Sequence, residues 1–151
     1  LVGSEMCIRD RYMVFSESVE DILSSSPSPL SSAHGSLFCD RDWLGEAIGN
    51  IVKNALDHTE KGDTIYIKWT ALPSAVQITI KDNGCGIHPE DLHHIFKRFY
   101  RSRFSKDTQG IGLGLPLAKA IIEAHGGLIE VESELGIGTS FIMNFPIPTK
   151  L

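Results

Sequence analysis

The sequence predicts an α+β domain, a two-layer sandwich in which helices cover one face of a mixed, mainly antiparallel sheet. Strand-like alternation of apolar and polar residues occurs in two hairpins, at 64–70 with 75–81 and at 128–133 with 139–147. Two further segments, 42–59 and 115–125, repeat apolar residues at helical spacing instead. Helices and antiparallel hairpins within 151 residues fit one two-layer domain.

The other segments are assigned from local signals. Residues 1–11 fit no element and resemble a translated sequencing-adapter artefact, so the domain is expected to span 12–151. The expected elements between the clear ones are a short edge strand at 12–15, a short helix at 16–25 capped by Ser16, a Ser/Pro-rich loop at 24–36, a short strand at 37–39, a helix at 89–100 that begins with Pro89, and a basic loop at 101–109. Gly126 and Gly127 are expected to end the helix at 115–125.

Charge and composition exclude several classes of function. The net charge of −5 argues against a general nucleic-acid binder, because a phosphate backbone requires a basic face. Cys7, Cys39 and Cys85 are too few and too scattered for a disulfide framework or a zinc site, which favours a reducing, cytoplasmic setting. No apolar run approaches the roughly 20 residues that span a bilayer, so this segment is expected to make no membrane contact.

The segment "QGIGLGLPLAKAIIEAHGG", residues 109–127, carries three alternate glycines before a helix. It lacks the G-x-G-x-x-G spacing of a dinucleotide-binding turn and the Lys-Ser/Thr of a P-loop. Backbone N–H groups without side chains at a helix start suit an anion. From these residues alone, a phosphate site and a flexible hinge are both possible.

A polar stripe runs along the helix at 42–59. Glu46, Asn50, Asn54 and Asp57 recur at helical spacing opposite the apolar face. A solvated face is the ordinary reading of such a stripe, but Asn is a poor residue for a helix interior. Two Asn one turn apart favour ligand contact, and an amide oxygen suits Mg²⁺ that also binds phosphates. A second polar cluster, "DNGCGI" at 82–87, is by default an Asn-Gly turn, but its glycines would let Asp82 approach a flat ligand.

Five segments in this order resemble a known family. "NIVKNALDHT", "DNGCGI", "IFKRFYR", "GIGLGLPLAKAIIEAHGG" and "GIGTSF" are similar to the N, G1, F, G2 and G3 boxes of the catalytic ATP-binding domain of bacterial sensor histidine kinases. The resemblance implies the Bergerat ATP-binding fold, bound ATP and Mg²⁺, and phosphoryl transfer to a histidine. It also implies two partners, a histidine-bearing dimerisation domain and a response regulator, and a cytoplasmic position within a membrane-bound sensor.

The resemblance also implies a role for each matching residue. Asn54 is expected to coordinate Mg²⁺ between the ATP phosphates, and Asn50 to line the same site. Asp82 is expected to accept a hydrogen bond from the adenine amino group, with Thr139 at the same end. The remaining expected positions are His58 beside the nucleotide, Gly84, Gly86 and Ile87 around the pocket floor, Phe96 and Phe99 as aromatic anchors, Arg101, Arg103 and Lys106 in a mobile lid, and Gly110, Ile111, Gly112, Leu113 and Gly114 at the lid hinge and phosphates.

The chain departs from the family pattern at two points. Asp57 stands where many members carry a Lys or Arg that pairs with phosphate, so it is expected to point outward or to act through water or Mg²⁺. The phosphoacceptor motif is absent, and His34 lacks its context, so the acceptor histidine is expected on another domain.

Three alternatives share or approach this pattern. Related ATPases place a Glu one turn before the metal-binding Asn to activate water, where this chain has Asn50. Anti-sigma serine kinases share the fold but are not expected to carry "IFKRFYR". A non-enzymatic nucleotide sensor would be favoured by loss of the glycines or Asn54, which are intact.

Overall fold

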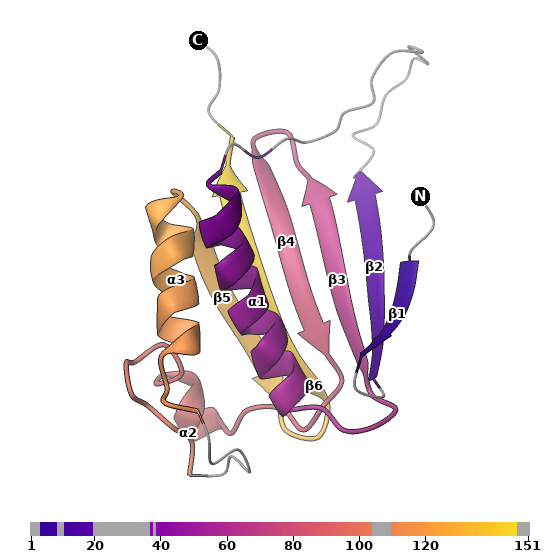
Figure 1. Ribbon diagram of the computed structural model, residues 1–151, viewed down its shortest axis with the longest axis vertical. Coiled ribbons are helices and arrows are strands. Elements are labelled where there is room, and N and C mark those ends of the chain that lie inside the picture. Colours follow the sequence, from indigo (N-terminus) through magenta and orange to yellow (C-terminus); the bar gives the residue numbers. More distant parts are fainter. Residues whose placement is uncertain (1–3, 9–10, 20–36, 38, 104–109, 148–151) are drawn as a thin grey trace.

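The computed structural model describes residues 4–8, 11–19, 37, 39–103 and 110–147. A six-stranded sheet in the order β1-β2-β3-β4-β6-β5 forms one layer, and helices form the other. Figure 1 shows α1 and α3 side by side over the part of the sheet made by β4, β6 and β5, with α2 near one end of α3. The expected two-layer α+β sandwich is therefore confirmed.

Two antiparallel hairpins build the centre of the sheet. β3 (Thr64–Ala71) pairs with β4 (Ala75–Asp82), and β5 (Leu128–Glu134) pairs with β6 (Gly138–Pro146). β4 also pairs antiparallel with β6, in a register that sets Asp82 opposite Thr139. β5 is an edge strand, and its residues alternate between exposed and partly buried.

The N-terminal part of the sheet differs from expectation. β1 (Ser4–Ile8) pairs antiparallel with β2 (Arg11–Val19), and β2 pairs parallel with β3. The predicted helix at 16–25 is wrong for 16–19, because the pairing with β3 continues through Val19. β2 is also not an edge strand, because β1 lies beyond it. The residues near Ser16 carry a local signal for a helix start, but pairing with the distant strand β3 overrides it. The sequence around Ser16 contains no information about that pairing.

Helix α1 (Arg41–Asp57) confirms the clearest sequence prediction. The Asp40 side chain caps it by accepting hydrogen bonds from the backbone N–H groups of Asp42 and Trp43, at 3.1 Å each. The predicted strand at 37–39 is not formed at Leu37 or Cys39, which pack against the core as the chain approaches the cap. The predicted loop at 24–36, which includes His34, lies outside the described residues.

Helix α3 (Gly114–Ala124) follows the glycine segment and ends at the expected glycines, with Gly126 at φ +73°. His125 joins its end to the start of α1. Its Nδ1 donates to the carbonyl of Ile121 at 2.8 Å, which leaves Nε2 to accept the backbone N–H of Asp40 at 3.0 Å.

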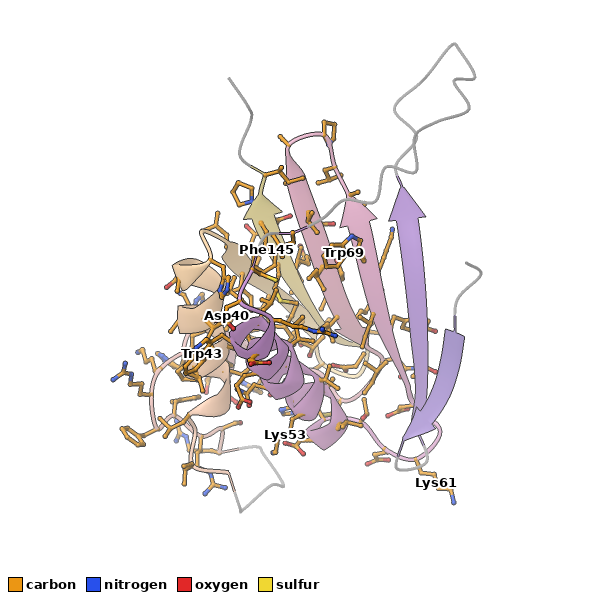
Figure 2. The ribbon with its side chains drawn as sticks, turned by 45° about the horizontal axis from the view of Figure 1, so that its top comes forward. Asp40, Trp43, Lys53, Lys61, Trp69 and Phe145 are labelled. Atoms are coloured by element: carbon orange, nitrogen blue, oxygen red, sulfur yellow. The ribbon has the colours of Figure 1, made fainter. Side chains whose placement is uncertain are left out.

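The core lies between the helices and the sheet. Ala47, Ile51 and Ala55 from α1 and Ala118, Ile121 and Ile122 from α3 are buried against strand residues that include Ile80, Phe141 and Phe145. Figure 2 labels Phe145 and Trp69 on the sheet and Trp43 on α1. The Trp43 side chain is about half exposed. Because the apolar stripe of α1 is buried, its polar stripe faces a different neighbour, the glycine segment.

The expected helix at 89–100 is much shorter in the structure. Helix α2 spans only Pro89–Leu92, and turns follow as far as Phe99. Phe99 takes a positive φ of 61°, and its N–H donates to the carbonyl of Gly112 at 2.9 Å. A continuous helix cannot include such a residue.

No helix among the described residues is long and apolar enough to cross a membrane.

Candidate functional site

A cavity of about 490 Å³ opens between α1, the turn after β4, α2 and the glycine segment. We call it the central cavity. Its lining residues are Asn50, Lys53, Asn54, Asp57, His58, Cys85, Gly86, Ile87, His88, Asp91, Ile95, Tyr100, Arg101, Ser102, Gly110, Gly112, Gly114, Leu115, Pro116 and Leu135. Segments distant in the sequence therefore converge here, as the sequence analysis expects for Asn50, Asn54, Asp57, His58, Gly86, Ile87, Arg101, Gly110, Gly112 and Gly114.

A second hollow adjoins the central cavity on the side of the glycine segment. We call it the glycine hollow, and it is lined by Glu46, Asn50, Lys53, Asp57, Gly110, Ile111, Gly112, Leu113, Gly114 and Leu117. The polar stripe of α1 thus faces the glycines directly. A Cβ on Gly114 would lie 3.6 Å from Oδ1 of Asn50, which shows how closely the two segments approach.

The two asparagines carry the most informative atoms of the site. Among the described residues, the buried side-chain nitrogen or oxygen atoms without a hydrogen-bond partner are Nδ2 of Asn50, Nδ2 of Asn54 and Nδ1 of His94. A buried unpaired amide costs free energy on the order of 1–3 kcal/mol. Two such amides on one cavity wall indicate groups that a ligand satisfies.

The same amides fit a magnesium ion that is held jointly with phosphate. The described residues contain no group of three His, Cys, Asp or Glu side chains that would hold a metal by themselves. Amide oxygens of Asn50 and Asn54 can supply part of a Mg²⁺ coordination shell, because Mg²⁺ in proteins commonly takes few side-chain ligands and completes its shell with phosphate and water.

Asp82 is not among the residues that line the central cavity, although Cys85, Gly86 and Ile87 of the same turn are. Its side chain is buried, at 1% exposure, and Oδ1 accepts the N–H of Gly84 at 2.9 Å. Burial raises the pKa of this carboxyl, and the hydrogen bond from Gly84 opposes the rise only in part. The buried site therefore disfavours the charged form of this carboxyl.

Thr139 is buried opposite Asp82 and is also absent from the cavity wall. Its hydroxyl lies 2.8 Å from Oγ of Ser133, and the same Ser133 oxygen accepts the N–H of Ile87 at 2.7 Å. Thr139 and Ser133 thus tie the turn after β4 to β5 and β6. Gly86, at φ +75°, approaches the carbonyl of Glu134 so closely that a Cβ would collide with it.

The aromatic residues before the glycine segment divide into two kinds. Phe96 packs against the core, edge-on to Phe141 at 6.4 Å, with the ammonium of Lys119 5.2 Å from its ring centre. The expectation of a Phe99 anchor is wrong, because Phe99 is 72% exposed and does not line the cavity. Tyr100 lines it instead, since the left-handed turn at Phe99 directs the two side chains differently.

Tyr100 and Ser102 both donate side-chain hydrogen bonds to the carboxylate of Asp91, one to each oxygen. Burial alone would raise the pKa of Asp91, but the bonds from Ser102 and Tyr100 outweigh burial, so its pKa lies below the usual value. The bond to Asp91 is also the main reason that the pKa of Tyr100 is raised.

Asp57, which was expected to point outward or to act through water or Mg²⁺, lines the cavity and pairs with a lysine. Its Oδ2 lies 2.8 Å from Nζ of Lys53, one helical turn earlier, and both residues line the central cavity and the glycine hollow. Arg103 is described but does not line the cavity, and Lys106 lies outside the described residues.

Sequence reasoning missed Lys53, Cys85, Asp91, Tyr100 and Leu135 as wall residues. The spacing of Lys53 and Asp57 was a usable signal, because an i, i+4 Lys–Asp pair on a helix predicts contact. The others had none, since their placement depends on how the turns after α2 and β4 fold back.

Comparison with known proteins adds to this geometry. Residues 39–149 match the family described as histidine kinase-, DNA gyrase B- and HSP90-like ATPases. The sensor protein SrrB of Staphylococcus aureus is 44% identical over 111 residues, which are 72% of this chain and 19% of SrrB. The chain therefore spans about a fifth of the curated relatives it matches.

Two solved structures share the fold. The mycobacterial sensor histidine kinase MprB is 25% identical, with a TM-score of 0.66 over 89% of this chain and 81% of that one. Full-length ShkA in complex with AMPPNP is 27% identical, with a TM-score of 0.66 over 91% of this chain and 26% of that one. Together with the family match, these relatives show that the chain belongs to the histidine kinase-, DNA gyrase B- and HSP90-like ATPases and is homologous to sensor histidine kinases.

Proposed function

We propose that this domain binds Mg²⁺-ATP in the central cavity and the glycine hollow and donates the γ-phosphate to a histidine on a separate dimerisation domain. The observation that carries the proposal is the pair of buried, unpartnered amides of Asn50 and Asn54, which face the glycine segment. AMPPNP, a nucleoside triphosphate analogue, is bound in the relative ShkA. The histidine-bearing domain and a response regulator are the proposed partners.

The residues of the cavity have distinct parts in this proposal. Asn54, with Asn50 beside it, holds Mg²⁺, which when bound neutralises charge on the phosphates. The backbone N–H groups of the glycine segment, at the start of α3, approach the phosphates. Asp82 accepts a hydrogen bond from the adenine amino group, with Thr139, Gly84 and Ile87 shaping that end. His58 lies beside the nucleotide. Positioning of this kind is the main requirement of phosphoryl transfer.

Transfer to a protein is favoured over hydrolysis because three polar groups on the described cavity wall, Asp57, Asp91 and Asn50, are poor bases. The carboxylate of Asp57 is paired with Lys53, and that of Asp91 accepts hydrogen bonds from Tyr100 and Ser102, which lower its pKa and its basicity. Asn50 is an amide with no useful basicity. These three groups therefore offer water little general-base assistance.

The test mixes the chain with Mg²⁺-ATP and a separately made helical hairpin that carries the phosphoacceptor histidine of a related sensor kinase. Acid-labile, base-stable phosphate on the hairpin is the expected product. Rapid ATP hydrolysis without transfer would instead indicate an ATPase, and phosphoserine on an added protein an anti-sigma type of kinase.

The variant Asn54→Asp checks the assigned site in the same assay. It keeps the size of the side chain but replaces the amide by a second negative charge near phosphate. We expect ATP affinity to fall about tenfold or more, as for loss of a bond to a charged group. Unchanged affinity and transfer would refute the placement of the phosphates at Asn54.

A further inference from the structure

Lys53 and Asp57 form an ion pair at the boundary between the central cavity and the glycine hollow. They lie one turn apart on α1, with 2.8 Å between Nζ and Oδ2, and both residues line both spaces. Figure 2 shows Lys53 near the C-terminal end of α1. The Lys53 side chain is 63% exposed, so its ammonium group has room to reorient.

The pair matters because the proposed ligand is a polyanion. A carboxylate at Asp57, on the same walls as Asn50 and the glycine segment, would repel phosphate. The other carboxylate of the central cavity, Asp91, is held by Tyr100 and Ser102. Glu46 and Asp57 both line the glycine hollow, but of these two only Asp57 also lines the central cavity, so its charge has to be compensated at the boundary between the two spaces.

The position of Lys53 allows its ammonium group to compensate Asp57 and to contact a phosphate as well. An ammonium group carries three donors around one compact charge, so it can serve a carboxylate and a phosphate oxygen together. The glycine segment faces Lys53 across the hollow, and its N–H groups are suited to the same anion. A phosphate in the hollow would then meet Lys53 from α1 and backbone donors from the opposite wall.

We propose that Lys53 binds the terminal phosphates of ATP and at the same time neutralises Asp57, which holds the ammonium group at the wall. The proposal rests on the proposed function, because it concerns the same cavity. The phosphate-binding cation of α1 is then Lys53, one helical turn before Asp57.

The experiment measures the affinity of the full chain for ATP and for AMP, with Mg²⁺ present, by isothermal titration calorimetry. Lys53→Met keeps the length of the side chain and removes its charge. We expect it to weaken ATP binding about tenfold, the loss of one charge-assisted bond, and to change AMP binding less than about twofold because AMP lacks the outer phosphates. Lys53→Arg should retain most of the ATP affinity.

A second measurement tests the coupling to Asp57. In the background Asp57→Asn, the change Lys53→Met should cost about threefold less affinity than in the wild type, because no bare carboxylate then faces the phosphate. Equal costs in the two backgrounds would refute the compensation of Asp57.

The control variant is Lys68→Met, an exposed lysine on β3 that lines neither space. If Lys53→Met binds ATP as Lys68→Met does, while the wild type binds ATP, the inference about Lys53 is wrong and the proposed function stands. If the wild type itself binds no ATP, the proposed function fails as well. Circular dichroism of each variant shows whether the fold is retained.

Discussion

The hydroxyl group of Tyr100 donates a hydrogen bond to the carboxylate of Asp91, and this bond joins the end of the turns after α2 to the wall of the central cavity. Ser102 bonds the second oxygen of the same carboxylate. We expect Asp91→Asn to destabilise the protein by about 1–3 kcal/mol, because an amide can accept only one of the two bonds well. Urea unfolding at pH 7 measures this difference.

The same substitution has a defined pH dependence. The pKa of Asp91 is lowered below its ordinary 3.8 in the folded protein, so its stabilising contribution is present above pH 3.8 and is lost as the pH falls through the lower folded value. The difference in unfolding free energy between wild type and Asp91→Asn should be equal at pH 7 and pH 5. It should shrink only below about pH 3.8. A difference that already disappears at pH 5 would contradict this assignment.

Unlike Asp91, Asp82 should contribute to ATP binding and not to stability at neutral pH. Burial raises its pKa, so its contribution to stability is complete below pH 3.8 and is lost as the pH rises through the folded value. Because burial disfavours the charged form of Asp82, Asp82→Asn should be at least as stable as the wild type. ATP affinity should fall about tenfold or more, because the bond to the adenine amino group loses its charge.

Calorimetric ATP binding and thermal unfolding of Asp82→Asn check both halves of this prediction, with exposed Asp42→Asn as the control. A stable variant with unchanged ATP affinity would remove Asp82 from the nucleotide site. A strongly destabilised variant would show that Asp82 is retained for the fold instead.

Gly112 should tolerate no side chain. Its φ is +71°, and a Cβ there would lie 2.6 Å from the carbonyl oxygen of Tyr100. Gly136 has a similar φ of +77° but no atom within 4 Å of a Cβ, which makes it a matched control. The left-handed φ alone costs about 1–2 kcal/mol, or a Tm lower by about 3–6 °C for Gly136→Ala. Gly112→Ala should lower the Tm further and weaken ATP binding, and equal Tm values would exclude the collision with Tyr100.

The N-terminal segment should be dispensable for nucleotide binding. The family match begins at residue 39, while β1 (Ser4–Ile8) pairs only with β2 at the far edge of the sheet. We expect deletion of residues 1–10 to leave ATP affinity unchanged within about twofold, since β1, the described part of this segment, lines neither the central cavity nor the glycine hollow. A loss of affinity would show that residues 1–10 belong to the functional domain.

Much of the fold was predictable because its patterns are local. The apolar stripe of α1, the alternation of β3 to β6 and the glycines after α3 each reflect one element and its buried face. The strand at Ser16–Val19 was not predictable, because it depends on a parallel ladder to β3 some fifty residues away. The backbone turn at Phe99 likewise involves a contact outside its own segment, the bond from its N–H to the carbonyl of Gly112.

The wall residues that could be predicted from the sequence belong to short motifs with a fixed order of residue types. Asn50, Asn54, His58 and four of the expected glycines, Gly86, Gly110, Gly112 and Gly114, lie on the walls, whereas Gly84 does not. Phe99 was misplaced because its backbone takes a left-handed φ that a helical pattern does not reveal. The pairing of Asp57 with Lys53 follows from their i, i+4 spacing on α1, a local signal that the family motif does not contain.

The edge position of β5 has a consequence for how copies of the chain behave together. Its outer side leaves backbone groups available for pairing, but Glu130, Glu132 and Glu134 alternate along it as exposed side chains. A second copy that paired with this strand would bring rows of carboxylates together, so their repulsion opposes strand-to-strand aggregation at neutral pH. Replacement of these glutamates by neutral residues would remove this protection, and the variant should aggregate more readily than the wild type.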